Sequence, residues 1–144
     1  MRLEALTPRE ASIFACLTDV VVAPEPVLPP VRETTAVEYF DRWMARSPKL
    51  NRTAVRALLY AIELAPRLAG LGGRLRQLDR AERERWRGRV ARSSLPQVRQ
   101  LAKLVQGFAA VSYYGDDRIM LRVGYDPDER LRRGRELRTK EGRP

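Results

Sequence analysis

The sequence of 144 residues contains no histidine and a single cysteine, and these two shortages exclude several classes of active site. Without histidine the chain has no Ser-His or Cys-His nucleophile, no His-ligated haem and almost no way to build an ordinary catalytic zinc site. Cys16 cannot form a disulfide within the chain, which is typical of proteins from a reducing compartment. Because Ile13, Leu17 and Val20 share its predicted helix, we interpret Cys16 as a small buried hydrophobe. We expect no catalytic, cofactor-binding or metal-binding residue in this chain.

Strands, phosphate-binding loops and long apolar runs are also missing. No segment shows a convincing strand pattern, and the glycine-rich residues 70–73 have neither dinucleotide-binding nor P-loop spacing. The longest apolar candidate, residues 20–23, ends at Pro24 and falls far short of the roughly 18 residues that span a bilayer. The N-terminus lacks a basic region followed by an apolar one. We therefore expect no export signal in the chain itself and a cytoplasmic location.

Helix caps and prolines divide the chain into five or six predicted helices, which indicates an all-α fold. A capping box from Thr7 to Glu10 opens the first helix, which runs to about Val22. A second box, from Thr35 to Glu38, opens a helix that the Ser-Pro pair at residues 47–48 ends. The other predicted helices are one from Asn51 to Ala65-Pro66, one opened by a box from Asp79 to Glu82, one that starts at Leu95-Pro96, and a short one from Arg118 to Val123.

The helix that starts at Leu95-Pro96 has the cleanest apolar stripe, so we expect it at the centre of the fold. The connections vary in length and carry proline and glycine, including a proline-rich loop over residues 24–30, so we expect an irregular bundle in one domain over residues 1–126. We interpret that loop as a linker over the first helix, with an SH3-type recognition motif as the alternative. Residues 127–144 have few apolar side chains and are expected to form a basic, poorly ordered tail or a frayed helix. The stripe consists of Val98, Leu101, Val105, Phe108 and Ser112.

The most informative local pattern is Ser-Tyr-Tyr-Gly-Asp-Asp at residues 112–117, followed by Gly-Tyr-Asp-Pro at residues 124–127. Gly115 stands where a helix needs a residue in the left-handed conformation, and Asp116 or Asp117 can then cap the next helix. Gly124 repeats the stop, so two chain reversals are expected to bring three tyrosines together. Two interpretations remain for these tyrosines, as anchors of a partner surface or as half-buried core aromatics: Tyr113, Tyr114 and Tyr125.

Four aspartates lie in the same region. Cation binding through their oxygens is one interpretation, but their spacing does not match an EF-hand loop. Each aspartate also stands where a helix cap or a turn former is expected, and we favour that explanation. They are Asp116, Asp117, Asp126 and Asp128.

These motifs, together with Asn51-Arg52 and residues 56–63, resemble the small companion subunit of GMC-type flavin oxidoreductases. That group is related to the gluconate 2-dehydrogenase subunit 3 family and is similar to the N-terminal extension of long-chain alcohol oxidases. The resemblance spans residues 6–126 and implies a chain without a cofactor that supports folding, assembly or export of an FAD-dependent alcohol or sterol oxidoreductase. Many members carry a twin-arginine signal that this sequence lacks, and Asp117 stands where proline is frequent. The partner surface is expected to include Tyr113, Tyr114, Gly115, Asp116, Tyr125 and Asp126.

Most of the chain's net charge of +10 lies within residues 74–103. One interpretation is that Arg83, Arg87 and Arg89 dock on an acidic protein or a membrane surface, and another is an ordinary solvated helix face. DNA binding has less support, because Trp86 is the only aromatic residue there and the following bend lacks the glycine of a helix-turn-helix. The sequence therefore favours a non-catalytic small subunit in a hetero-oligomer with a flavoprotein, and the alternative is a small basic nucleic-acid-binding helical protein.

Overall fold

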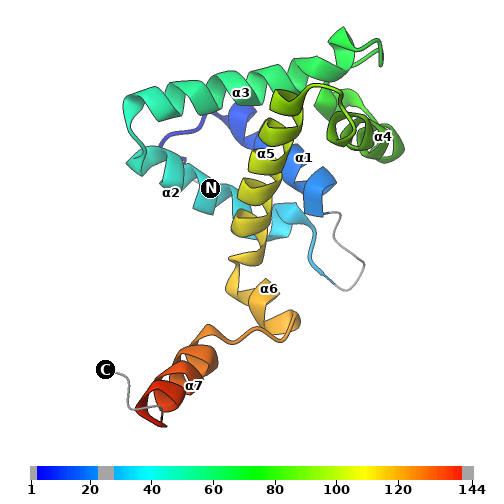
Figure 1. Cartoon of the computed structure of the whole chain (residues 1–144). Coiled ribbons are helices and arrows are strands. Elements are labelled where there is room, and N and C mark those ends of the chain that lie inside the picture. Colours follow the sequence, from blue (N-terminus) through cyan, green and yellow to red (C-terminus); the bar gives the residue numbers. More distant parts are fainter. Residues whose placement is uncertain (1–2, 23–27, 141–144) are drawn as a thin grey trace.

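A computed structural model describes residues 3–22 and 28–140, which form seven α-helices, two short 3₁₀ helices and no strand (Figure 1). The all-α class is therefore confirmed. The helices are α1 (Pro8–Val22), α2 (Ala36–Arg46), α3 (Lys49–Leu68), α4 (Arg80–Ala91), α5 (Pro96–Tyr114), α6 (Asp117–Arg122) and α7 (Pro127–Lys140), with the 3₁₀ helices η1 (Val31–Glu33) and η2 (Leu75–Gln77) between them. The predicted proline-rich loop lies largely outside the described residues, which resume at Leu28.

Helix α1, and not α5 as the sequence predicted, is the centre of the fold. It packs against α2, α3, α4 and α5, and its buried residues lie on several sides of the helix. Phe14 of α1 stacks on Phe40 of α2 with ring centroids 3.8 Å apart. Helix α5 buries only three residues, all near its C-terminal end: Ala109, Ser112 and Tyr113. The predicted stripe on α5 is therefore only partly covered.

Three predicted helix starts are confirmed. In the first capping box, the Glu10 backbone N–H donates to the Thr7 hydroxyl oxygen at 3.2 Å, and the Thr7 N–H donates to the Glu10 carboxylate at 2.8 Å. The box from Asp79 to Glu82 forms in the same reciprocal way at the start of α4. Proline at residue 96 opens α5 as expected, because its missing N–H would have no partner in a first turn.

A fourth start, that of α2, is right in position but not in its cap. Thr35 is the N-cap residue, yet its hydroxyl donates to the distant carboxylate of Asp116 at 3.1 Å and makes no cap hydrogen bond. The predicted start of α3 is wrong. Helix α3 begins at Lys49, directly after Pro48, so that Asn51 lies inside the helix. The same helix continues through Pro66 to Leu68, although proline at residue 66 removes one N–H donor from the hydrogen-bond ladder.

Four buried carboxylates tie segments of the chain together. Asp41 of α2 accepts hydrogen bonds from the backbone N–H groups of residues 4–6 and so holds the N-terminal segment. Glu63 of α3 pairs with Arg76 of η2 at 2.9 Å. Glu10 pairs with Arg56 of α3, and Asp116 is described below. A buried carboxylate is tolerated only with such partners, so each tie defines one arrangement of its segments.

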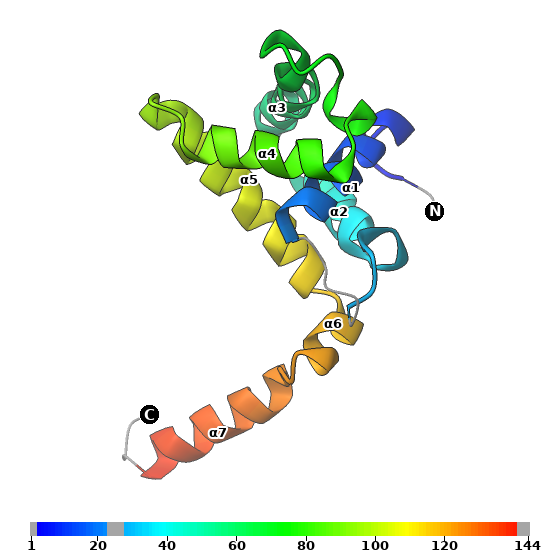
Figure 2. The same ribbon diagram turned by 90° about the vertical axis from the view of Figure 1, so that its right-hand side faces the viewer.

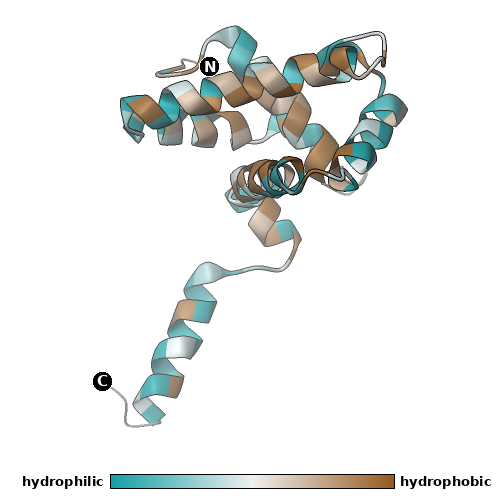
Figure 3. Ribbon diagram, turned by 45° about the horizontal axis from the view of Figure 1, so that its top comes forward, coloured by the Kyte–Doolittle hydropathy of each residue, from teal (hydrophilic) through white to brown (hydrophobic). Residues whose placement is uncertain are grey.

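Helix α7 accounts for the difference between the expected five or six helices and the observed seven. It has no buried residue and lies beyond α6, away from the other helices (Figures 1 and 2). Its ribbon in Figure 3 is mostly teal, the colour of hydrophilic residues, and is interrupted by brown hydrophobic segments. Local interactions explain why it is helical: Asp126 accepts from the N–H groups of Asp128 and Glu129, and Glu129 pairs with Arg133 one turn later at 2.6 Å.

Candidate functional site

The three tyrosines of the predicted surface have different environments. Tyr113 is fully buried and its hydroxyl donates to the carbonyl oxygen of Pro29 at 2.7 Å, while burial, followed by the proximity of Tyr114 and Asp116, raises the pKa of its phenol. Tyr114 is 42% exposed and meets the Tyr113 ring edge-on. Tyr125 lies against Arg130 of α7, and no ring contact joins it to the other two among the described residues. Tyr113 is thus a core residue, and only the other two are accessible.

Gly115 does not have the positive φ that the sequence predicted. Its φ is −78°, in the ordinary right-handed region, and the left-handed glycine of this segment is Gly124 at φ 71°. A side chain is nevertheless excluded at Gly115, because a Cβ atom there would lie 2.7 Å from the Val111 carbonyl oxygen. Close approach to the end of α5, and not backbone handedness, requires glycine.

Asp116 is the polar centre of this turn. It is 3% exposed and caps α6 by accepting from the Arg118 N–H at 2.9 Å. Its carboxylate also accepts from the Arg118 guanidinium at 3.0 Å and from the Thr35 N–H at 2.8 Å. The Arg118 side chain above all, opposed by burial and assisted by Thr35, holds the pKa of this carboxyl well below its usual range. Asp116 therefore joins the start of α2 to the start of α6.

The other predicted acidic residues act as caps or lie on the surface. Asp126 caps α7, and Asp117 is exposed in the first turn of α6. Among the described residues, no group of three or more histidine, cysteine, aspartate or glutamate side chains could hold a metal ion. The interpretation of Asp116 and Asp126 as caps agrees with their hydrogen bonds.

Two of the three predicted docking arginines make bonds within the fold. Arg83 donates to the carbonyl oxygens of Leu75 and Arg76, and so holds η2 against α4. Arg87 donates to the carbonyl oxygens at the C-terminal end of α1, those of Val20 at 3.3 Å and Val21 at 3.1 Å. Arg89 alone of the three has no bond of this kind in the described chain and is exposed.

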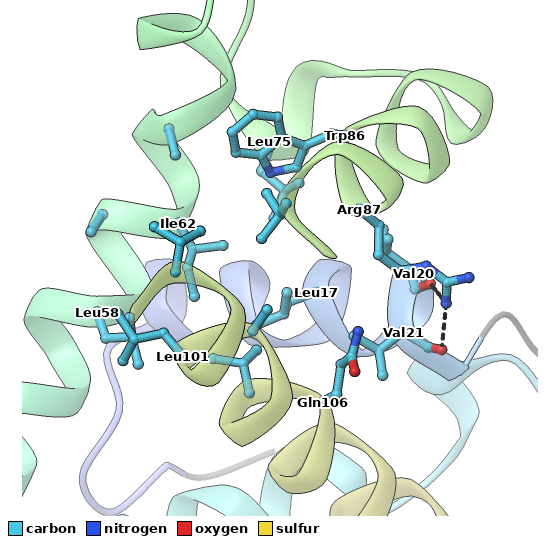
Figure 4. A pocket seen from close by; sticks show the side chains of 16 residues that line it. Leu17, Val20, Val21, Leu58, Ile62, Leu75, Trp86, Arg87, Leu101 and Gln106 are labelled. Atoms are coloured by element: carbon cyan, nitrogen blue, oxygen red, sulfur yellow. Dashed lines mark hydrogen bonds between the residues drawn. The ribbon is translucent and has the colours of Figure 1, made fainter. Parts of the chain in front are cut away.

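The first surface that the sequence analysis missed is an apolar pit of about 390 Å³ beside α5 (Figure 4). Helices α3 and α5 each pack on α1 but make few contacts with each other, which leaves the space open. Helix α4 closes one side and α1 with η2 forms the floor. Prominent lining residues are Leu17, Val21, Leu58, Ile62, Leu75, Trp86, Arg87, Leu101 and Gln106.

The second missed surface is a groove of about 350 Å³ between α2 and α5, here called the α2–α5 groove. Aromatic residues Tyr39, Trp43 and Phe108 line it, together with Lys103 and Leu104. Next to it, α5 exposes a row of apolar side chains, which we call the α5 ridge. The ridge consists of Leu101 (47% exposed), Leu104 (53%), Val111 (57%) and Tyr114 (42%).

The α5 ridge could have been predicted from the sequence. Its residues lie three or seven positions apart and so share one helix face, and α5 contains no acidic residue at all. The predicted stripe of the same helix includes Leu101 and lies partly on a different face. Apolar residues around most of a helix indicate contacts on more than one side.

Comparison with protein-family models, curated proteins and solved structures found no match to this chain. None of the helices in the described ranges combines the length and hydropathy needed to cross a membrane. The function is therefore inferred from the residues and their placement.

Gly115→Ala is expected to lower the free energy of unfolding by about 1 to 2 kcal/mol, because the new Cβ atom must displace the Val111 carbonyl. Gly107→Ala is the matched control within α5, since nothing lies within 4 Å of a Cβ atom there. That change should raise stability by about 0.5 to 1 kcal/mol through helix propensity. Urea unfolding measures both, and a Gly115→Ala variant as stable as the wild type would contradict the close contact.

Asp116→Asn is expected to lower the free energy of unfolding by about 2 kcal/mol at neutral pH, because Arg118 and Thr35 lose a charged acceptor. The folded-state pKa of Asp116 is depressed, so its contribution is complete above the unfolded pKa of about 3.9 and is lost as the pH falls below that value. The two proteins should therefore converge in stability in acid. Asp117→Asn, at the exposed neighbour, should change stability by about 0.5 kcal/mol or less. Equal losses in both variants would refute the role given to Asp116.

Proposed function

We propose that this chain is a non-catalytic small subunit that binds a larger protein through the α5 ridge and the α2–α5 groove. The observation that carries the proposal is the exposed apolar row on α5 beside an aromatic-lined groove. Large apolar patches on soluble proteins mark interaction sites, and aromatic side chains are enriched where binding energy concentrates. The resemblance described above supports a GMC-type FAD-dependent alcohol or sterol oxidoreductase as the partner.

The extent of the surface supports a subunit that is completed by a partner. The chain exposes 9892 Å². A compact monomer of 16.5 kDa would expose about 7,500 Å². The excess agrees with the exposed α7 and with the uncovered face of α5. A partner that covers these helices would remove apolar area from water, which is the main favourable contribution to association.

The groove has features that favour a specific contact. Lys103 lies on it, and the absence of acidic residues from α5 favours an acidic counterpart. Gly107 allows a second helix to approach closely, since nothing lies within 4 Å of the space above it.

The C-terminal region offers a further contact area. Tyr114 and Tyr125 are accessible enough to act as the anchors expected from the sequence, and Arg89 remains a candidate for charge steering. Helix α6, the residue that follows it and helix α7 expose four more apolar side chains. They are Leu121, Val123, Leu131 and Leu137. We propose that these residues are covered by the same partner, while Tyr113, Gly115, Asp116 and Asp126 shape the turn and the helix ends behind them.

Nucleic-acid binding is the less favoured alternative. Arg83 and Arg87 of the basic helix α4 donate to backbone carbonyl groups of this chain, so part of their hydrogen-bonding capacity is used within the fold and not for phosphates. Reversing both charges would consequently lower the melting temperature of the free protein. Arg89→Glu avoids that effect and tests the charged surface alone.

Leu104→Glu is expected to weaken binding to the co-purifying flavoprotein by about 2 kcal/mol, or roughly 30-fold, because a charge enters the centre of the apolar ridge. The melting temperature should change little, since Leu104 is 53% exposed. Leu50→Glu is the matched control on α3, where leucine is 80% exposed and outside the groove. Affinity measured by surface-based binding assays should fall only for Leu104→Glu, and equal affinities would place the partner elsewhere.

The assignment of the partner is tested by purification from the native host. We expect FAD absorbance and alcohol oxidation in the complex, and neither in this chain purified alone. Turnover or stoichiometric flavin in the isolated chain would overturn the companion-subunit proposal. Recovery of nucleic acid in place of a flavoprotein, lost in Arg89→Glu, would favour the alternative.

A further inference from the structure

The apolar pit beside α5 is polar at one side only. Arg87 and Gln106 are the two polar residues among those that line it, and no acidic residue does. Figure 4 shows both at the side of the pit formed by Val20 and Val21, whereas Leu58 and Ile62 lie on the opposite wall. An apolar chamber with one polar end is the arrangement that an amphipathic molecule requires.

The walls of the pit are held apart by interactions that are independent of any ligand. The ion pair between Glu63 and Arg76 ties α3 to η2 at 2.9 Å. Arg83 ties α4 to η2, and Arg87 ties α4 to the end of α1. Because α3 and α4 are both tied to the floor, these two walls cannot simply close over the space, and the pit is preformed on their sides.

Arg87 presents a positive group at the polar end. Its Nη1 atom donates to the Val20 and Val21 carbonyl oxygens, which positions the guanidinium. The Nε and Nη2 groups make no further hydrogen bond in the described chain and are available to a ligand. A guanidinium with two such N–H groups matches a carboxylate, which can accept two hydrogen bonds in parallel.

From this arrangement we infer that the pit binds a medium-chain aliphatic carboxylate. The carboxylate pairs with Arg87, the Gln106 amide lies beside it, and the apolar chain extends toward Leu58 and Ile62. A volume of about 390 Å³ lies within the range of sites for small ligands. A straight helix from a partner fits less well, because α3 and α5 run in different directions around the pit (Figures 1 and 2).

The two tryptophans of the chain make this inference testable apart from the proposed function. Trp86 lines the pit and Trp43 lines the α2–α5 groove. Trp43→Phe leaves Trp86 as the only tryptophan, and Trp86→Phe leaves only Trp43. Decanoate, titrated below its micellar concentration, should cause a saturable blue shift in the emission of Trp43→Phe and no saturable change in Trp86→Phe. A response from Trp43 alone, or no saturable response, would overturn the inference.

Two variants test the position of each end of the ligand. Ala61→Phe fills the pit from α3 and should weaken decanoate binding at least tenfold, whereas Ala54→Phe, exposed on the same helix and outside the pit, should not. Arg87→Gln should weaken decanoate binding several-fold more than decanol binding, because loss of the contacts to Val20 and Val21 affects both ligands whereas loss of the charge affects only the carboxylate. A merely structural effect of Arg87 would weaken both ligands equally. Equal loss of decanoate and decanol affinity in Arg87→Gln would overturn the inference. Full decanoate affinity in Ala61→Phe would do the same.

Discussion

The rest of the structure depends on one constraint, which is that four helices, α2 to α5, all pack against α1. A single 15-residue helix offers limited surface, so helices that share it must diverge from one another. Helices α3 and α5 both contact α1 but meet each other only weakly, and the pit is the space left between them. The position of this cavity therefore follows from the way in which α3 and α5 pack on α1 and not on each other. The residues around it are apolar because they lie on the helix faces that also contact α1.

Arginine side chains make several of the hydrogen bonds that hold this arrangement of helices. Arg87 donates to carbonyl oxygens at the C-terminal end of α1, where helix geometry leaves acceptors without intrahelical partners, and Arg83 donates to carbonyl oxygens of η2. A long side chain with several donors reaches such groups from a neighbouring helix. The high positive charge of the chain is thus partly a consequence of its fold, and it is a weaker indication of nucleic-acid binding than the composition alone suggests.

The sequence predicted most features that depend on a few adjacent residues, with the Asn51 cap and the φ of Gly115 as exceptions, and it failed for those that depend on distant residues. The capping boxes at Thr7 and Asp79 follow from four consecutive residues, and both form. Thr35 has the same local pattern, but its hydroxyl is taken by Asp116, which lies 81 positions away. The exposed row on α5 could be found from its spacing, whereas the pit combines residues of four helices and a 3₁₀ turn that no local pattern connects.

Helix α5 separates two surfaces with different chemistry. On one side of it, the aromatic groove and the exposed ridge present apolar area that association would remove from water. On the other side, the pit is a partly open apolar space with a guanidinium at its edge. Because Leu101 belongs to the ridge and also lines the pit, a ligand that moves this side chain would alter the surface offered to a partner. The two surfaces can therefore be energetically coupled through one side chain, and by linkage any effect of the ligand on partner affinity must equal the effect of the partner on ligand affinity.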